Sequence, residues 1–257
     1  MNDSDVIAGL NAVFAALAAA PDEIEGLWVD RERRDGRMNA ILSRARTTHV
    51  RVQHVPRASL DRLCPGTAHQ GVVARRRPRA RPPEGDLMGL VETRAQPLLL
   101  VLDQVQDPHN LGACLRTAEA AGAHAVIVPR HARAPLSAAA CKAACGAAER
   151  IPLYEVANLA RTLKALKERG VWLVGASAQG AASLHAQAIP ESVAFVLGGE
   201  GAGLRRLTRE ACDLLVRIPM SGAAESLNVS VAAALCLYES VRQRALANCV
   251  GAREPLE

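Results

Sequence analysis

The sequence predicts an α/β protein built around a mostly parallel β-sheet with helices on both faces. Three observations lead to this expectation. From residue 98 onwards, short apolar runs alternate with segments of helical periodicity, which is typical of parallel sheets. The run Leu98–Leu102 is apolar at every position, as in a strand covered on both faces. A stretch rich in Arg and Pro at 75–83 separates this part from a smaller α/β unit.

The smaller unit occupies about residues 6–76. A helical face is expected from residue 6 to 17, and its apolar members are Val6, Leu10, Val13, Phe14 and Leu17. A second helix is expected over 36–46, and strands are expected over 24–29, 50–55 and 70–74. Prolines and charges at 75–97 favour an extended linker. We therefore expect three parts, at residues 1–76, 77–97 and 98–257.

The larger unit contains six expected strands with helices between them. The strands are expected over 98–102, 125–128, 151–156, 171–175, 193–197 and 214–218. The helices are expected over 111–121, 136–145, 159–169, 204–211 and 227–246. This order favours a single sheet with both faces covered.

The composition provides a large core but few aromatic side chains. Apolar residues make up 49% of the chain and aromatic residues 2%, so a binding face made of rows of stacked aromatic rings is nearly excluded. The formal charge is −6 over residues 1–30, +11 over 31–81 and 0 over 82–257. Charge concentrated in this way predicts a nucleic-acid contact. The alternative is a solvated face that keeps the protein soluble.

The seven cysteines do not form a metal-binding pattern. No pair has Cys-x-x-Cys spacing, and no His cluster lies near Cys141 and Cys145. We expect free thiols in a reducing compartment and no metal. Residues Asn2–Asp5 are acidic where a signal peptide is basic, and no apolar run is long enough to cross a membrane. We therefore expect a soluble, cytoplasmic protein without a membrane partner.

Three loops that follow expected strands are rich in Gly and polar residues, and ligands bind at such loops in parallel sheets. The first loop begins at residue 103. In it, Asn110 is well placed to cap the following helix. Arg116 lies in an otherwise apolar helix face with Leu111 and Leu115, so its guanidinium needs a partner or a ligand.

The second loop, 197–204, holds four glycines, among them Gly198 and Gly199. Glycines at this density allow a backbone to approach a ligand closely. Glu200 stands between glycines and has no packing reason to be there. A dinucleotide fingerprint is the alternative, but it belongs after the first strand of a unit, and its third Gly is missing here.

The third loop, 218–232, leads into the last expected helix. Ser226 at the helix start can act as an N-cap, whereas Asn228 and Ser230 in the first turn are less easily explained in that way. The free N–H groups of a first helical turn can hold a ligand.

Together these loops resemble the three ordered motifs of the SpoU (TrmH-type) RNA ribose 2′-O-methyltransferases. The matching segments are Asn-Leu-Gly-Ala-Cys-Leu-Arg at 110–116, Gly-Gly-Glu-Gly-Ala-Gly-Leu at 198–204, Ile-Pro-Met-Ser-Gly at 218–222 and Ser-Leu-Asn-Val-Ser-Val-Ala at 226–232. The resemblance covers about residues 97–246. Segments at 69–74, 145–149 and 205–210 resemble the subgroup that methylates a guanosine in the P loop of bacterial 23S rRNA.

The resemblance implies a fold, a cofactor and site residues. The fold would be a SPOUT-type sheet threaded into a trefoil knot, preceded by an L30e-like domain that recognises RNA. S-adenosyl-L-methionine would be held by Gly198, Gly199, Ile218, Met220 and Leu227. The catalytic residues would be Asn110, Arg116, Glu200, Ser226 and Asn228. The partners would be 23S rRNA or a large-subunit precursor and a second copy of the chain, and DNA would be excluded because it lacks the 2′-hydroxyl.

The implied reaction moves a methyl group from a sulfonium to a ribose 2′-oxygen and depends on in-line geometry. An Arg stays protonated in proteins, so Arg116 is expected to stabilise the developing alkoxide or to grip a phosphate rather than to act as a base. Three alternatives stay open: a tRNA guanosine 2′-O-methyltransferase, a non-catalytic rRNA-binding assembly factor and a nicotinamide oxidoreductase. The separate N-terminal unit disfavours the first, the intact motifs disfavour the second, and the loop position disfavours the third.

Overall fold

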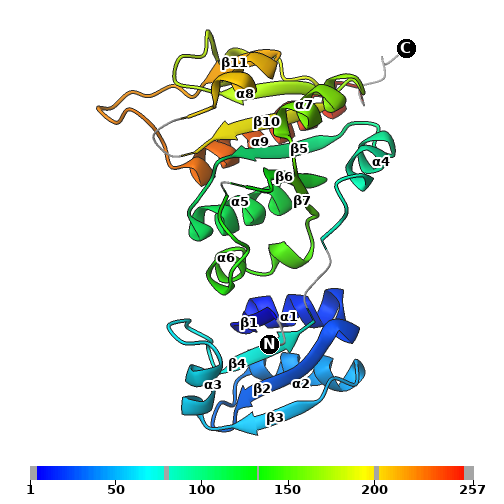
Figure 1. Ribbon diagram of the computed structural model, residues 1–257, viewed down its shortest axis with the longest axis vertical. Coiled ribbons are helices and arrows are strands. Elements are labelled where there is room, and N and C mark those ends of the chain that lie inside the picture. The colour runs from blue at the N-terminus through cyan, green and yellow to red at the C-terminus, as the bar shows by residue number, and fades with distance from the viewer. Residues whose placement is uncertain (1–4, 78–80, 132, 200–202, 252–257) are drawn as a thin grey trace.

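The computed structural model describes residues 5–77, 81–131, 133–199 and 203–251, and it places them in two α/β units arranged along the long axis of the molecule (Figure 1). The smaller, N-terminal unit is at the bottom of the view and the larger unit is at the top. Among these residues, no helix combines the length and the apolar character needed to cross a membrane.

The smaller unit is a four-stranded mixed sheet with helices on both faces. Its elements are β1 (Asp5–Ala8), α1 (Leu10–Ala19), β2 (Ile24–Asp30), α2 (Gly36–Thr47), β3 (Val52–Val55), α3 (Arg57–Leu63) and β4 (Val72–Arg76). The strand order is β1-β4-β2-β3, with β4 antiparallel to both neighbours and β2 parallel to β3. The helices α1 and α2 cover one face over a core that includes Leu17, Leu27 and Ile41. The helix α3 packs on the other face through Leu60.

Two expectations for this unit are wrong. Val6 lies in β1 rather than in the first helix, because the chain turns at Gly9, whose φ of 101° is open to glycine. Phe14 is 44% exposed and lies outside the buried face of α1. The helix α3 was not predicted, since seven residues are too few to show a clear helical period.

The larger unit confirms the predicted parallel sheet. Its strands are β5 (Leu98–Asp103), β6 (Ala125–Pro129), β7 (Leu153–Val156), β8 (Trp172–Ala176), β9 (Ala182–Ser183), β10 (Val193–Gly198) and β11 (Leu214–Arg217). Its helices are α4 (Asp86–Glu92), α5 (Pro108–Ala120), α6 (Ala138–Ala143), α7 (Leu159–Lys167), α8 (Arg206–Ala211) and α9 (Val229–Gly251). The strand order is β7-β6-β5-β10-β8-β11-β9, and each neighbouring pair of these strands is parallel.

Helices cover both faces of this sheet. On one face, Leu111 of α5 and Leu237 of α9 belong to the same core as Phe195 of β10. On the other face, Leu87 of α4 and Leu163 of α7 form a second core. The strand β5 is buried at all of its positions between these cores, as its continuous apolar run predicted.

The segment expected as an extended linker contains the helix α4. Its side chains Leu87 and Val91 are buried in the larger unit. Residues 86–92 therefore pack as part of the second core of the larger unit rather than as a spacer. The helix was not expected because it has only seven residues and follows a segment dense in charges and prolines.

A buried ion pair joins the two units. Arg76 at the end of β4 pairs with Glu149 in the 3-10 turn Ala147–Glu149, and both side chains are almost fully buried. Beside this pair, Gly146 adopts a φ of 89° and lies against α1, where an added Cβ would be 2.6 Å from the Ala15 Cβ. Because a buried charge is costly without its partner, these contacts hold the smaller unit in a defined place on the larger one.

Candidate active site

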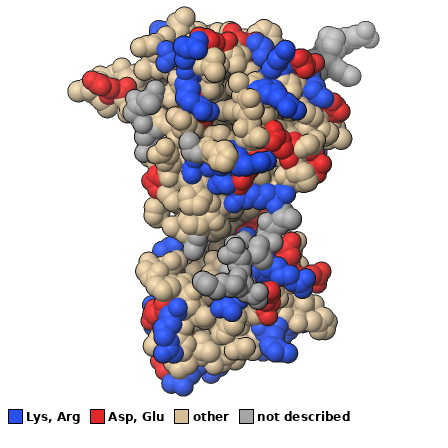
Figure 2. Space-filling model, in the orientation of Figure 1, with Lys and Arg blue, Asp and Glu red and all other residues tan. Residues whose placement is uncertain are grey.

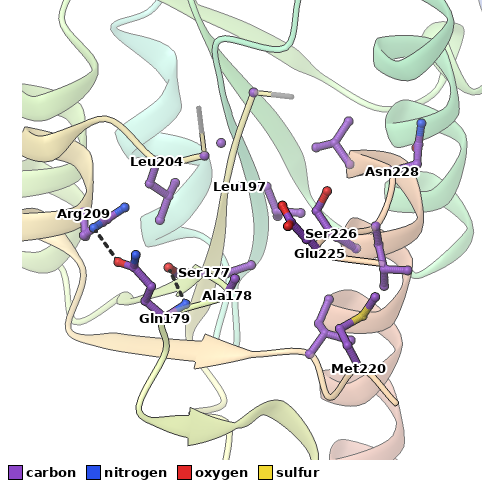
Figure 3. Close-up of a pocket in the computed structure, with 18 residues that line it drawn as sticks. Ser177, Ala178, Gln179, Leu197, Leu204, Arg209, Met220, Glu225, Ser226 and Asn228 are labelled. Atoms are coloured by element: carbon purple, nitrogen blue, oxygen red, sulfur yellow. Dashed lines mark hydrogen bonds between the residues drawn. The ribbon is translucent and has the colours of Figure 1, made fainter. Parts of the chain in front are cut away.

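A cavity of about 550 Å³ lies at the carboxyl ends of β8, β10 and β11. Figure 3 shows it between the loops that follow these three strands and the start of α9. All five predicted cofactor-binding residues line it: Gly198, Gly199, Ile218, Met220 and Leu227. Two predicted catalytic residues, Ser226 and Asn228, line it as well. The structure thus brings the second and third motifs together around one space.

The glycines of the second motif are required by the protein's own backbone. A Cβ on Gly198 would lie 2.0 Å from the carbonyl carbon of Gly203, and Gly199 pairs with Gly203 in an isolated β-bridge. A Cβ on Gly199 would meet the carbonyl oxygen of Gln104 at 2.4 Å. The sequence predicts that these glycines let the backbone approach a ligand. In the structure they let the backbone approach two other segments of the chain, at Gly203 and at Gln104. Glu200, predicted to be catalytic, lies outside the described residues.

A buried aspartate stabilises the exit from this loop. Asp103 is the last residue of β5, pairs in register with Gly198 and is fully buried. Its carboxylate forms an ion pair with the Arg205 guanidinium at 2.6 Å. Arg205 comes directly before α8, so this pair fixes the path of the chain after the glycine-rich segment.

Asn110 and Asn228 connect the first motif to the third. The side-chain amide of Asn228 donates a hydrogen bond to the Asn110 side-chain oxygen at 2.9 Å. Asn110 is not the N-cap that the sequence indicated, because Asp107 caps α5 by accepting a hydrogen bond from the His109 backbone N–H. Asn110 is instead inside the first turn and buried. Its partner in the third motif is 118 residues away in the chain.

The start of α9 also differs from the expectation. The helix begins at Val229, and the Asn228 side-chain oxygen accepts a hydrogen bond from the Ser230 N–H at 2.9 Å. Asn228 therefore has the capping role that the sequence gave to Ser226. The Ser226 hydroxyl is left at the cavity, where Figure 3 shows it beside Glu225.

Arg116 does not line the cavity. It is exposed on α5, and its Nη1 lies 3.5 Å from the Cys145 Sγ. Leu111 and Leu115 are buried against the sheet, but one further residue turns the helix by about 100° and directs Arg116 away from them. The prediction that this guanidinium lies in an apolar face is therefore wrong for the single chain.

The sequence reasoning missed a third wall of the cavity. Ser177, Ala178 and Gln179 follow β8 and line the space together with Arg209 of α8. The Arg209 guanidinium donates a hydrogen bond to the Gln179 side-chain oxygen at 3.3 Å, as Figure 3 shows. The rule that ligands bind at the carboxyl ends of parallel strands predicts a role for this loop, but the loop has fewer glycines than the loop at 197–204 and therefore a weaker sequence signal.

Two cysteines of the larger unit, Cys212 and Cys236, lie outside the lining of the cavity and have weakly acidic thiols. Cys212 lies against the nearby Gly175, and burial raises the pKa of its thiol to about 12. Burial likewise raises the pKa of Cys236 in α9 to about 12. These thiols stay protonated at neutral pH and are poor nucleophiles. Within the described part of the chain, no three His, Cys, Asp or Glu side chains are grouped so that they could hold a metal ion.

Comparison with protein families assigns both units. Residues 97–238 match the SpoU rRNA Methylase family, and residues 6–82 match the family described as RNA 2′-O ribose methyltransferase substrate binding. A protein from Bordetella pertussis named 23S rRNA (guanosine-2′-O-)-methyltransferase RlmB is 53% identical over 95% of this chain and 99% of its own length. The protein of the same name from Escherichia coli is 47% identical over 94% and 99%.

Solved structures agree with this assignment. The SpoU methyltransferase AviRb from Streptomyces viridochromogenes, in complex with the cofactor AdoMet, superposes with a TM-score of 0.78 at 26% identity, covering 94% of this chain and 91% of that one. The A. aeolicus TrmH/SpoU tRNA modifying enzyme superposes with a TM-score of 0.55 at 28% identity and covers only 64% of this chain and 84% of its own. On the matched motifs, the shared fold and the near full-length relatives, the chain belongs to the SpoU rRNA methylase family.

Proposed function

We propose that this protein transfers the methyl group of S-adenosylmethionine to the ribose 2′-oxygen of a guanosine in 23S rRNA. The observation that carries the proposal is the meeting of the second and third motifs around one cavity. Relatives about half identical over nearly the whole chain are named for this reaction. The tRNA-modifying neighbour covers only about two thirds of the chain, which favours rRNA over tRNA.

The residues around the cavity fit the cofactor. A volume of about 550 Å³ is within the range of small-molecule sites. Apolar side chains such as Leu197, Met220 and Leu227 suit an adenine ring, and the loop backbones supply hydrogen-bonding groups. Glu225 is the one acidic side chain among the described lining residues, and a carboxylate there favours a cofactor that carries a sulfonium and an ammonium group.

When bound, the cofactor supplies an electrophilic methyl group, and the chain supplies position and charge. The hydrogen bond between Asn110 and Asn228 holds the starts of α5 and α9 together beside the cavity, and such fixed geometry is the main source of rate for an in-line transfer. Arg116 keeps its positive charge and would bind the phosphate beside the target ribose or the developing alkoxide. Ser226 lines the cavity, and its hydroxyl can hydrogen-bond the ribose there.

The exposed position of Arg116 supports a site completed by a second copy of the chain. Val231 and Tyr238, seven residues apart on α9, are large apolar side chains that are about half exposed, and residues at this spacing share one helix face. We place the homodimer contact on this face, with Arg116 of the partner subunit near the cavity. Light scattering should give a dimer, and mixing inactive Arg116→Ala with inactive Asn228→Ala should restore part of the activity.

The roles of the two units follow from the same reading. Residues 1–76 would recognise rRNA or a large-subunit precursor, and residues 98–257 would carry out the transfer in the cytoplasm, where that substrate is made. DNA would not be methylated because it lacks the 2′-hydroxyl. The trefoil knot and the L30e-like classification of the smaller unit stay predictions.

The test is a methylation assay with purified protein. The protein, S-adenosylmethionine carrying a labelled methyl group, and either 23S rRNA or tRNA are incubated, and the modified ribose is mapped by mass spectrometry. We expect one 2′-O-methylguanosine in 23S rRNA. Methyl transfer to tRNA would show that the protein is instead a tRNA guanosine 2′-O-methyltransferase. If the protein binds the cofactor but methylates neither RNA and no precursor particle, it is an rRNA-binding assembly factor.

A further inference from the structure

The open face of the smaller sheet carries an unusual aromatic side chain. Trp28 in β2 is one of only six aromatic residues in the chain, and it is half-buried on the face that α3 covers only in part. The unit that holds it contributes no lining residue to the cavity. Figure 2 shows basic and acidic side chains mixed over the visible surface of this unit, so the net charge alone does not identify an RNA contact.

The Trp28 indole is held in one orientation by three neighbours. It lies above Gly26, where an added Cβ would be 2.8 Å from the ring. Its Nε1–H donates a hydrogen bond to the Gln53 side-chain oxygen at 3.1 Å. The Arg75 guanidinium carbon lies 5.4 Å from the centre of the ring. A glycine below, an amide at the edge and a cation over the ring fix the indole as a platform.

The strand register places two arginines on either side of this platform. Arg75 of β4 pairs with Gly26, two residues before Trp28, so its side chain lies on the same face as the indole and reaches over the ring. Gln53 of β3 pairs with Trp28, and Arg51 precedes Gln53 by two residues, which directs it to the same face. Both arginines are exposed, and neither forms an ion pair with an acidic side chain of the described residues.

The helix beside this face adds positive charge. Arg57 and Arg62 of α3 are exposed, and α3 packs on the same side of the sheet through Leu60. The one acidic residue of α3, Asp61, accepts a hydrogen bond from the His69 ring at 2.9 Å. The face therefore combines a fixed aromatic ring, a stacked guanidinium and several cations, the set of groups with which proteins bind unpaired nucleotides.

We propose that this face, formed by Trp28, Arg51 and Arg75, binds a single-stranded segment of the RNA substrate. An unpaired base stacks on the Trp28–Arg75 pair, and Arg51 contacts a neighbouring phosphate. The inference rests on the proposed RNA substrate and adds to it the place and the chemistry of docking. Because the face lies outside the cavity, it sets the affinity for RNA and leaves the transfer step unchanged.

The experiment measures RNA binding and tryptophan emission in the full-length protein. A Trp172→Phe background removes the second indole, which lies at the start of β8 in the larger unit. Titration with a short single-stranded RNA of mixed sequence should quench Trp28. Arg51→Ala and Arg75→Ala should each weaken binding several-fold. Arg51→Ala, which removes the phosphate contact, should also lower the slope of log K against log salt by about 0.7. In the methylation assay, the two variants should raise KM for rRNA and leave kcat unchanged.

Matched variants separate this site from general charge and from misfolding. Arg46→Ala removes an exposed arginine from α2, which covers the opposite face, and it should change the affinity less than twofold. Trp28→Leu should weaken binding by about tenfold, whereas Trp28→Phe should retain most of it because a phenyl ring still stacks. Equal losses for Arg46→Ala and Arg75→Ala, or quenching equal with double-stranded RNA, would overturn the proposal.

Two outcomes distinguish this inference from the proposed function. If 23S rRNA is methylated but binding is indifferent to Trp28, Arg51 and Arg75, the docking face is wrong and the activity stands. If RNA quenches the Trp28 fluorescence and the arginine variants lower the affinity for RNA, but no rRNA ribose is methylated, the docking face is supported and the proposed function is wrong.

Discussion

The contact between Gly198 and Gly203 allows a direct test of how the cavity is built. In Gly198→Ala, the new Cβ would lie 2.0 Å from the Gly203 carbonyl carbon, 2.1 Å from its oxygen and 2.3 Å from the Leu204 nitrogen. Ordinary contact begins at 3.4 Å, so the opposing backbone must move by about 1.4 Å. All three of these contacts are with main-chain atoms, which cannot turn aside as a flexible side chain can.

The displaced segment is a wall of the cavity, since Gly203 and Leu204 both line it. Overpacking of this kind costs about 1–3 kcal/mol of unfolding free energy. A movement of more than an ångström in a wall also removes contacts with the ligand, and a loss of about 1.4 kcal/mol in binding is a tenfold rise in Kd. We therefore expect Gly198→Ala to lower the affinity for S-adenosylmethionine by at least about tenfold.

Gly222→Ala is the matched control. Gly222 lies in the third loop, and an added Cβ there meets no atom within 4 Å. The affinity of Gly222→Ala for S-adenosylmethionine should therefore stay within twofold of the wild type. Calorimetry gives both Kd values, and urea unfolding gives the stability of both variants. An unchanged Kd for Gly198→Ala would refute the reasoning, and so would an equal loss in both variants, because either result would separate cofactor affinity from this backbone contact.

Three further predictions concern other parts of the molecule. Arg116→Ala should abolish methyl transfer and leave the calorimetric affinity for S-adenosylmethionine intact, because Arg116 does not line the cavity of its own chain and the partner's Arg116 is proposed to contact the RNA; a parallel loss of affinity would contradict its role. Glu149→Gln should lower the urea unfolding free energy by about 3 kcal/mol, since it removes the carboxylate charge that faces the buried Arg76 guanidinium. The double variant Arg76→Met with Glu149→Leu should regain most of this loss, and a loss as large as that of Glu149→Gln would contradict the reasoning. Hydrogen bonds from Arg242, followed by those from Gln243 and His185, lower the pKa of Glu239 from 4.5 to about 2. Its contribution is therefore complete above pH 4.5 and lost as the pH falls toward 2, so the stability gap between wild type and Glu239→Gln should close over that range, and a gap constant with pH would disprove it.

Much of the larger unit could be predicted because its signals are local. The run Leu98–Leu102 is apolar at each position, and a strand buried on both faces needs this composition. The glycine-rich and polar loops follow such strands, and parallel strands bring their carboxyl ends to one edge. Gly198 and Leu227, which the family resemblance assigns to the cofactor, follow β10 and β11 in the chain, and both line the cavity.

Capping residues could not be assigned from the sequence because several candidates stand close together. Asp107 and Asn110 have similar capping preferences. Asp107 is the N-cap because Pro108, which follows it, is well suited to the first helical position. Asn110 then forms its hydrogen bond with Asn228, which caps another helix, α9. No local pattern contains that second partner, so the sequence could point to Asn110 but could not give the reason for it.

Arg116 shows why a chemically important side chain can lack any packing signal. The sequence argument started from cost, since a cation within an apolar helix face needs a partner. The structure removes that cost by placing Arg116 in solvent while Leu115 is buried beside it. An exposed arginine is inexpensive for the fold, and therefore folding does not explain why this position carries one. The reason has to lie in what the exposed side chain meets, and the two candidates on the proposed function are an RNA phosphate and the cavity of a second subunit. The same holds for Arg51 and Arg75 in the smaller unit. Both are exposed, so packing does not explain why these positions carry arginine, and their grouping around Trp28 is the feature that indicates a ligand. For Arg116, Arg51 and Arg75, which form no ion pair with an acidic side chain of the described residues, the explanation therefore has to come from what the protein binds rather than from how it folds.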